Sequence, residues 1–422
     1  VILFGALILM LPVASAERVV TPFHETLFTA TSAVCVTGLA VQDTGSYWSV
    51  FGQTVVMLLI QIGGLGVVTV ATSVVMLSGR KISLMQRSTM QDAISAPQVG
   101  GIVRMTRFIL KGTLLVELAG AILLLPAFLR DFGIRGIWLA VFHSISAFCN
   151  GGFDLMGTVS QPFVSMTRYV GHPLVNIVLM LLIVVGGIGF MTWEDVCTNR
   201  WHFKRYRLQS KVILFTSTLL VVVPAVFFFV NDFAGMSFGR RLLAALFQSV
   251  TTRTAGFNTA DLSQMTGASQ AVMIALMLIG GSPGSTAGGL KTTTIAVLIL
   301  NAFSTFKNQE NVEVFGRRLD PQVIRTAATI LMMYLTLFFA GGIAISVYEG
   351  LPLSLCFFES ASAVGTVGLT LGLTPGLHLF SQVILIVLMF LGRVGGLTLI
   401  YAVLSNKRTM NAKFPAEHMT IG

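Results

Sequence analysis

The stretch SAVCVTGL, Ser32–Leu39, decides the fold, because the 422-residue chain contains three further versions of it. They are SAFCNGGF (Ser146–Phe153), VTTRTAGF (Val250–Phe257) and SAVGTVGL (Ser362–Leu369). Each version ends in a glycine followed by Leu or Phe, and successive versions lie about a quarter of the chain apart. Each also lies between two long apolar runs. A loop that recurs in four such settings predicts four similar quarters around a common axis.

The composition places these quarters in a lipid bilayer. The chain is 54% hydrophobic and only 10% charged, whereas soluble domains average roughly a quarter charged residues. Apolar runs of about 20 residues, the length needed to cross a bilayer core, recur along it. The net charge is +10, and the 27 Lys and Arg residues gather mainly in alternate connections, which we expect to face the cytoplasm. The basic charge therefore indicates topology, and no nucleic-acid partner is predicted.

Each quarter is predicted to contain a span, a short helix, the loop and a second span. The run Thr21–Val34 would form a helix only about 18 Å long, which is half a bilayer. The other short helices are predicted at Gly136–Phe148, Phe238–Thr251 and Leu353–Ala363. The predicted fold class is an all-α polytopic membrane protein. Its four span/pore-helix/filter-loop/span repeats share one orientation, with pseudo-fourfold symmetry around a central pore.

The predicted repeat boundaries follow from this unit. Repeat 1 is 1–78, with a first helix expected to begin before Val1, and repeat 2 is 79–198. Repeat 3 is 199–303, repeat 4 is 304–405, and 406–422 form a cytoplasmic tail. Eight spans would place both termini in the cytoplasm. The second spans are expected at Val50–Leu77, Pro173–Met191, Ala271 onward and Leu379–Leu404.

The loops predict an ion pore rather than an enzyme. Irregular backbone at membrane depth is tolerated where it lines a water-filled path. Rings of backbone carbonyls can replace the hydration shell of a cation, and helix C-termini add negative partial charge. The four cysteines and six histidines show no metal-binding spacing, and the spans contain no catalytic constellation. An alternating-access secondary cation carrier stays open as the alternative.

The four glycine loops resemble the Trk/Ktr/HKT superfamily of potassium transporters, and eight spans favour the Ktr-type ion-translocating subunit (KtrB-like). The resemblance implies that backbone carbonyls of the loops form the ion-binding filter. The implied filter residues are Val36, Thr37, Gly38, Asn150, Gly151, Gly152, Thr254, Ala255, Gly256, Thr366, Val367 and Gly368. Glycine at position 38 implies a preference for K⁺ as the transported ion, with Na⁺ as a further candidate and no organic cofactor.

The resemblance also implies the setting in which the chain works. It implies a bacterial plasma membrane, a homodimer, and regulation by a separate cytosolic ring (KtrA-like) that binds nucleotides. The basic cytoplasmic segments Arg200–Lys211 and Lys407–Lys413 are candidate contacts for that ring, although the positive-inside rule explains their charge equally well.

The third second-span contains GGSPGSTAGG, Gly280 to Gly289. Proline and repeated glycine prevent a continuous helix there, and Leu290 stands where a phosphate-binding loop needs glycine before Lys291. The resemblance implies an intramembrane gating loop beneath the filter. The implied gating residues are Gly280, Gly281, Ser282, Pro283, Gly284, Ser285, Thr286, Ala287, Gly288, Gly289, Lys291 and Arg393.

Two arginines need partners at membrane depth. Arg393 is expected below the filter, where the resemblance places such a residue, or alternatively paired with Glu117. Arg253 lies within the third loop, where its charge would repel cations, so we expect it to point away from the pore and to brace on Glu359. The glycine pairs of the second spans, such as Gly63–Gly64, are interpreted as helix-packing sites.

Overall fold

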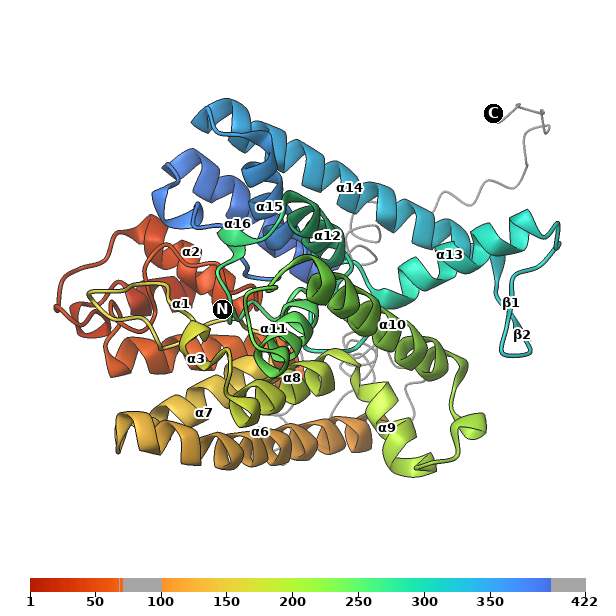
Figure 1. Ribbon diagram of the computed structural model, residues 1–422, viewed down its shortest axis with the longest axis horizontal. Coiled ribbons are helices and arrows are strands. Elements are labelled where there is room, and N and C mark those ends of the chain that lie inside the picture. The colour runs from red at the N-terminus through yellow and green to blue at the C-terminus, as the bar shows by residue number, and fades with distance from the viewer. Residues whose placement is uncertain (68, 71–100, 396–422) are drawn as a thin grey trace.

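A computed structural model of the protein describes residues 1–67, 69–70 and 101–395. This part of the chain is almost entirely helical, as predicted, with one two-stranded antiparallel sheet (Figure 1). The predicted repeat boundaries at 78/79 and 405/406 and the tail 406–422 lie outside the described residues. Those parts of the domain assignment stay predictions.

The first half of the chain holds two groups of helices, coloured red and orange to yellow in Figure 1. The first group is α1 (Ile2–Leu9), η1 (Pro12–Ala14), α2 (Phe23–Val34) and α3 (Val50–Leu65). The second is α6 (Ile102–Phe132), α7 (Arg135–Phe148), η2 (Thr167–Tyr169), α8 (Pro173–Gly187) and α9 (Phe190–Asn199).

The second half holds two more groups, coloured green and blue. The third group is η3 (Phe203–Arg205), α10 (Leu208–Asn231), α11 (Phe238–Thr251), η4 (Leu262–Gln264), α12 (Gly267–Leu278) and α13 (Thr292–Phe306), followed by strands β1 (Glu313–Val314) and β2 (Arg317–Arg318). The fourth is α14 (Pro321–Glu349), α15 (Leu353–Val364), η5 (Thr374–Gly376) and α16 (Leu379–Val394). The first group lies between the second and the fourth (Figure 1).

The short helices α2, α7, α11 and α15 begin and end within two residues of their predicted bounds. Each packs mainly against the helix that precedes it in the chain. Their C-terminal turns are fully buried, as in Thr29–Val34 of α2 and Ser360–Val364 of α15. Because the short helices end inside the molecule, the loops that follow them also lie in its interior.

The third second span is broken at the glycine-rich segment, as predicted, but α3, α8 and α16 also end earlier than the predicted spans. Among the described residues, three helices are long and apolar enough to cross a membrane, namely Val103–Phe132, Leu208–Asn231 and Pro321–Glu349. A fourth crossing is possible by length and composition if α8 and α9, which meet at 100°, form one bent span. The described helices of the other second spans are shorter: α3 ends at Leu65, α12 at Leu278 and α16 at Val394.

Glycines in a left-handed conformation cause three of these breaks. Gly66, Gly189 and Gly395 have φ values of +86°, +91° and +84°, a conformation that L-residues with side chains rarely adopt and that ends an α-helix. Each stands at the same distance after an earlier glycine of its helix: Gly63, Gly186 and Gly392. In the third quarter the break is the glycine-rich segment itself, which begins after α12.

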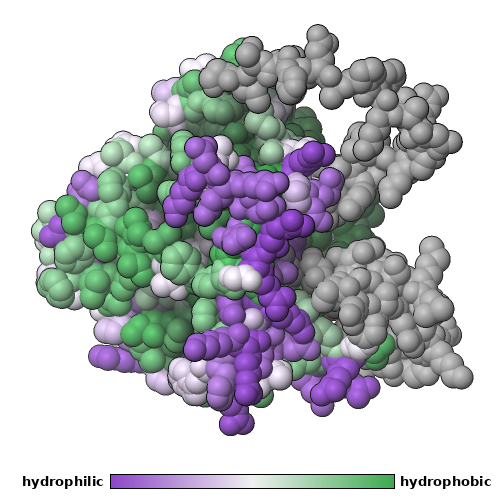
Figure 2. All heavy atoms as spheres, turned by 90° about the vertical axis from the view of Figure 1, so that its right-hand side faces the viewer, coloured by the Kyte–Doolittle hydropathy of each residue, from purple (hydrophilic) through white to green (hydrophobic). Residues whose placement is uncertain are grey.

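The surface around α9, β1 and β2 is hydrophilic. Figure 2 shows polar side chains gathered across this side of the molecule, with apolar side chains beside them. Phe315 in the β1–β2 turn packs edge-on against Phe203 at 6.4 Å between ring centroids, and the ammonium of Lys211 lies over both rings. This contact fixes the hairpin to the segment that precedes α10.

Candidate functional site

The four loops share a backbone conformation rather than a sequence. The residue two before each glycine, Val36, Asn150, Thr254 or Thr366, has a φ between +52° and +62°. Each glycine then has a φ between +68° and +94°. Left-handed φ is unusual for residues with side chains and exceptional for β-branched ones. Four sequences therefore adopt one strained shape, which turns the backbone in the same way after each short helix.

Hydroxyl groups hold this shape in two ways. In the first and fourth loops, Ser32 and Ser362 accept a hydrogen bond from the backbone N–H of Gly38 and Gly368, at 3.1 and 3.0 Å. In the second and third loops the hydroxyl donates instead, to the carbonyl after the glycine. Ser146 donates to Phe153 at 2.7 Å and Thr251 to Phe257 at 2.6 Å.

The four glycines form a closed ring in chain order. A Cβ added to any one of them would strike the backbone of the next loop, so no side chain fits at these positions. The nearest atoms are the carbonyl oxygens of Gly151 for Gly38 (2.8 Å), Ala255 for Gly152 (2.9 Å), Val367 for Gly256 (2.5 Å) and Thr37 for Gly368. The structure thus brings together all four of the loops in which the sequence placed the filter.

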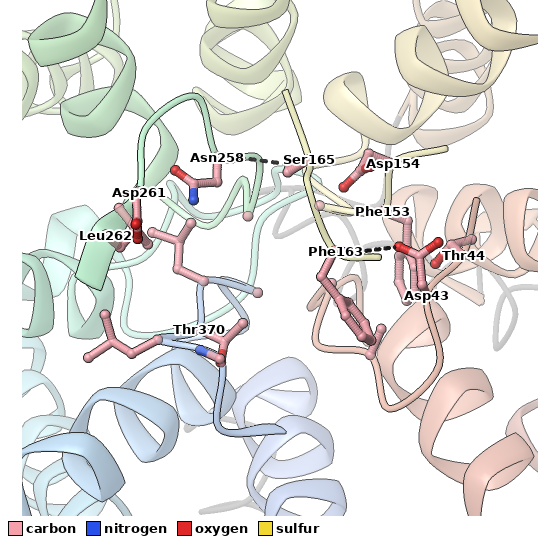
Figure 3. Close-up of a pocket in the computed structure, with 18 of the residues that line it drawn as sticks. Asp43, Thr44, Phe153, Asp154, Phe163, Ser165, Asn258, Asp261, Leu262 and Thr370 are labelled. Atoms are coloured by element: carbon pink, nitrogen blue, oxygen red, sulfur yellow. Dashed lines mark hydrogen bonds between the residues drawn. The ribbon is translucent and has the colours of Figure 1, made fainter. Parts of the chain in front are cut away.

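A cavity of about 260 Å³ lies on one side of this ring. All four glycines line it, together with polar side chains from the loops that follow them (Figure 3). Asp43, Asp154 and Asp261 are among the described residues that line it, and none of these lining residues is Lys or Arg. The described wall of this outer cavity therefore carries negative charge.

The outer loops are tied to one another by hydrogen bonds. The carboxylate of Asp43 accepts from the backbone N–H of Phe163 at 2.8 Å, and Ser165 accepts from Asn258 at 3.1 Å (Figure 3). The segment that contains Phe163 and Ser165, in the second quarter, thereby links the outer loops of the first and third quarters. Burial, together with the charge of Asp43, raises the pKa of Asp154 to about 6, although its carboxylate accepts a bond from Met156. The sequence predicts Asp43 and Asp154 on the outer side, either concentrating cations at the mouth or as scattered solvated carboxylates. It gives no sign of these hydrogen bonds.

The glycine-rich segment Gly280–Gly289 lies against the other side of the ring. The hydroxyl of Thr286 donates to the carbonyl of Phe148 at 3.1 Å, and a Cβ on Gly289 would lie 2.8 Å from the carbonyl of Gly365. The backbone N–H groups of Ser282 and Thr286 donate to Gly187 and Gly186 at 3.0 and 3.2 Å. The segment is therefore held directly beneath the second and fourth loops.

A larger cavity, of about 620 Å³, opens on the far side of this segment. Lys291 and Arg393 both line it. The ammonium of Lys291 donates back to the carbonyls of Ala287 and Gly288, at 2.8 and 3.4 Å. The segment and its two cations thus separate the ring of glycines from the second cavity.

Arg393 joins three quarters of the chain. Its guanidinium donates to the carbonyl of Thr286 in the segment and to those of Gly63 and Gly64 at the end of α3. It does not pair with Glu117, whose carboxylate accepts from Gln61 at 3.2 Å. Arg393 stands one residue after Gly392, where the first two quarters have a second glycine.

Two sequence interpretations are corrected here. Arg253 donates to the carbonyl of Gly280 at 3.4 Å rather than to Glu359, which accepts from Thr370 and from Thr374. The second interpretation is that of VGGL, Val394 to Leu397, the glycine pair of the fourth quarter. The packing glycine there is Gly392, whereas a Cβ on Gly395 would meet nothing within 4 Å. A Cβ on Gly392 would overlap the carbonyl of Val364, the last residue of α15. In the same way, a Cβ on Gly63 or Gly186 would overlap the carbonyl of the last residue of α2 or α7.

The chain is similar to known cation transport proteins. The family model for TrkH, described as a cation transport protein, matches residues 7–409. The chain is 37% identical over its whole length to the potassium/sodium uptake protein NtpJ of Enterococcus hirae, covering 94% of that protein. It is also 37% identical over 98% of its length to Ktr system potassium uptake protein B of Bacillus subtilis, covering 92% of it.

A solved structure shows the same fold. The potassium transporter TrkH from Vibrio parahaemolyticus superposes with a TM-score of 0.72 at 20% identity, over 95% of this chain and 83% of that one. The predicted resemblance is confirmed, and the protein is a multi-pass membrane transporter rather than an enzyme. The chain belongs to the TrkH family of cation transport proteins.

Proposed function

We propose that this chain takes up K⁺ through a channel-like pore whose filter consists of the backbone carbonyls of the four glycine loops. The closed ring of Gly38, Gly152, Gly256 and Gly368 between two cavities carries the proposal. The four short helices end at these loops, so their negative C-terminal partial charges favour a cation there. The acidic outer cavity would raise the local concentration of cations.

The filter residues can be tested directly by their ions. A structure determined in Rb⁺ or K⁺ should show density between the carbonyls of the four loops, next to residues such as Thr37 and Val367. Density confined to the outer cavity, with none between the loops, would contradict a carbonyl filter. Na⁺ is the second candidate ion, because the relative from E. hirae is named for both ions. Competition of Na⁺ with ⁸⁶Rb⁺ uptake measures the preference.

We further propose that Gly280–Gly289, with Lys291 and Arg393, gates the pore. The segment lies between the filter loops and the second cavity. Its hydrogen bonds reach the second and fourth quarters, and Arg393 also bonds the first. A cation leaving the filter toward that cavity would meet this segment and two positive charges. Deletion of Ser282–Thr286 should therefore raise ⁸⁶Rb⁺ flux into proteoliposomes.

The deletion needs a control for general loosening of the protein. Removal of Gly316 alone from the exposed β1–β2 turn keeps the contact of Phe315 with Phe203 and should leave flux unchanged. Loss of flux in monodisperse, inserted deletion protein would contradict the gate.

We infer that the working assembly is a homodimer regulated by a cytosolic ring that binds nucleotides, with four pseudo-symmetric repeats per chain and both termini in the cytoplasm. The relative from B. subtilis is one lettered component of a Ktr system, and the hydrophilic surface around β1 and β2 offers exposed Arg317 and Arg318 (Figure 2). Replacement of both arginines by Ala should weaken co-purification with a nucleotide-binding partner. Undiminished co-purification would show that the partner binds to another part of the surface.

An alternating-access carrier is the competing mechanism. In such a carrier, exchange of ⁸⁶Rb⁺ outside for K⁺ inside is faster than net uptake. In exchange the binding site crosses back with an ion bound, whereas net uptake requires the empty site to return. A pore lacks this acceleration. With the membrane potential held at zero, so that no K⁺ diffusion potential drives entry, strong stimulation of ⁸⁶Rb⁺ uptake by K⁺ inside the vesicle would therefore favour the carrier over the channel-like pore.

A further inference from the structure

A third cavity, of about 230 Å³, lies beside the ring of loops, between α8 and α10. Its walls are almost entirely aliphatic, and they include Ile183 and Val184 of α8 and Leu214 and Val222 of α10. Val184 is 37% and Val222 50% exposed. Since both helices lie at the side of the molecule, the cavity opens toward the lipid rather than toward either aqueous cavity.

One cationic side chain projects into this apolar cavity. Arg253 of the third loop lines it and is only 8% exposed. Its Nη2 donates to the carbonyl of Gly280, but Nε and Nη1 have no hydrogen-bond partner within the described part of the chain. The hydroxyl of Ser217, which also lines the cavity, is likewise without a partner there.

Unfilled donors on a buried guanidinium are costly. Arginine stays ionised in proteins, and a buried charge normally meets an opposite charge or several acceptors. Water alone is a poor substitute here, because an ordered buried water needs two to four polar partners and the walls are aliphatic. The cavity thus combines a surface for a hydrocarbon chain with donors for an anion.

We propose that this cavity binds a single-chain anionic amphiphile, a fatty acid whose carboxylate lies against Arg253 and Ser217. The chain would lie along the exposed valines between α8 and α10. A carboxylic acid can reach this depth in neutral form and then ionise beside the guanidinium. The phosphodiester of a phospholipid remains charged and would carry a large headgroup into hydrocarbon at high cost.

The position of the site links it to transport. Arg253 immediately precedes Thr254 of the third filter loop and bonds Gly280, the first residue of the glycine-rich segment. A carboxylate that draws the guanidinium into the cavity competes with that long bond. Fatty-acid binding should therefore change ⁸⁶Rb⁺ flux as well as occupy the cavity.

Native mass spectrometry of delipidated, full-length protein can test the site, with palmitate as the probe. We expect one palmitate per chain, and affinity about tenfold lower for hexadecanol, which has the same chain without the charge. Thr218→Trp should fill the cavity without altering the third loop and reduce palmitate affinity by a similar factor. Leu219→Trp is the matched control, because Leu219 is exposed on the same helix but does not line the cavity.

Three results would overturn the proposal. Equal palmitate affinity in Thr218→Trp and Leu219→Trp would place binding elsewhere. Equal affinity for hexadecanol and palmitate would show that Arg253 does not bind the carboxylate. Displacement of palmitate by phosphatidylglycerol at lower concentration would assign the cavity to a phospholipid instead. Arg253→Gln should lower palmitate affinity, and Arg253→Lys should restore part of it if the protein remains monodisperse.

Discussion

Gly368 of the last loop lies against Gly38 of the first: a Cβ on Gly368 would come within 2.9 Å of the Cα of Gly38. This contact closes the ring between the two ends of the chain. The nearest atom to such a Cβ is the carbonyl oxygen of Thr37, which belongs to the proposed filter. The space between these loops is therefore too small for any side chain.

Gly368→Ser should weaken ion binding in the ring. Serine would have to adopt a φ of +93° and displace the first loop. We expect the apparent K⁺ affinity of uptake to fall by at least about tenfold, or about 1.4 kcal/mol. Gly376→Ser is the control, because its Cβ meets nothing within 4 Å. Unchanged uptake kinetics in Gly368→Ser would show that the fourth loop is not part of the filter.

Arg393→Gln should raise flux by releasing the glycine-rich segment. The glutamine amide is shorter and uncharged, so it cannot hold the carbonyls of Thr286 and Gly63 together as the guanidinium does. Arg393→Lys keeps the charge but loses the fork of donors, and we expect an intermediate flux. The initial rate of ⁸⁶Rb⁺ entry into proteoliposomes measures both. Arg318→Gln, in the exposed hairpin, serves as the control, and a lower rate in Arg393→Gln would contradict a restraining role.

Uptake should depend on pH through Asp154. Its raised pKa of about 6 means that the carboxylate is charged above pH 6 and increasingly neutral below it. The outer cavity then loses attraction for cations, so the K⁺ concentration for half-maximal uptake should rise as pH falls from 7 to 5. Asp154→Asn should show the higher value throughout. A pH profile identical in the variant and the parent protein would assign the dependence to another group.

The same raised pKa affects stability. The folded protein binds the proton of Asp154 more tightly than the unfolded chain, so ionisation between the ordinary carboxyl pKa and pH 6 costs folding free energy. Asp154→Asn should accordingly be no less stable than the parent protein at neutral pH. This separates its effect on ion entry from an effect on folding.

Gly186→Ala should destabilise the protein even though alanine is the better helix former by about 1 kcal/mol. The added Cβ would overlap the carbonyl of Phe148 at the end of α7, and such overpacking costs about 1–3 kcal/mol. A lower Tm of the purified protein, followed by loss of the monodisperse peak on heating, is the expected result. Gly235→Ala, where a Cβ meets nothing, should leave Tm unchanged.

The sequence predicted the short helices and loops well, because each carries a local signal. A glycine after a short amphipathic run marks each loop, and the bounds of α11 agree with the prediction at both ends. Proline and repeated glycine predicted the break in the third second span, but the breaks at Gly66 and Gly189 were missed, although the pairs Gly63/Gly66 and Gly186/Gly189 were visible. Hydropathy counts apolar residues and does not register a single left-handed glycine that ends a helix.

The partners of the buried charges could not be predicted. Arg393 bonds the carbonyls of Gly63 and Gly64, which lie more than three hundred residues away in the chain. Backbone carbonyls leave no trace in side-chain composition, so sequence reasoning looked for acidic partners such as Glu117 and Glu359. Those carboxylates are instead satisfied by nearby amide and hydroxyl groups.

Since one polypeptide supplies all four loops, a mutation alters a single wall of the ring. In an assembly of four identical subunits the same mutation would appear four times. A difference as large as that between Val36 in the first loop and Asn150 in the second could then not exist, because all four positions would carry the same residue. Here the side-chain amide of Asn150 donates to the carbonyls of Phe148 and Ile183, at 3.2 and 3.3 Å, and no other loop has an amide at this position. In a single chain the wall of the ring can therefore change one loop at a time.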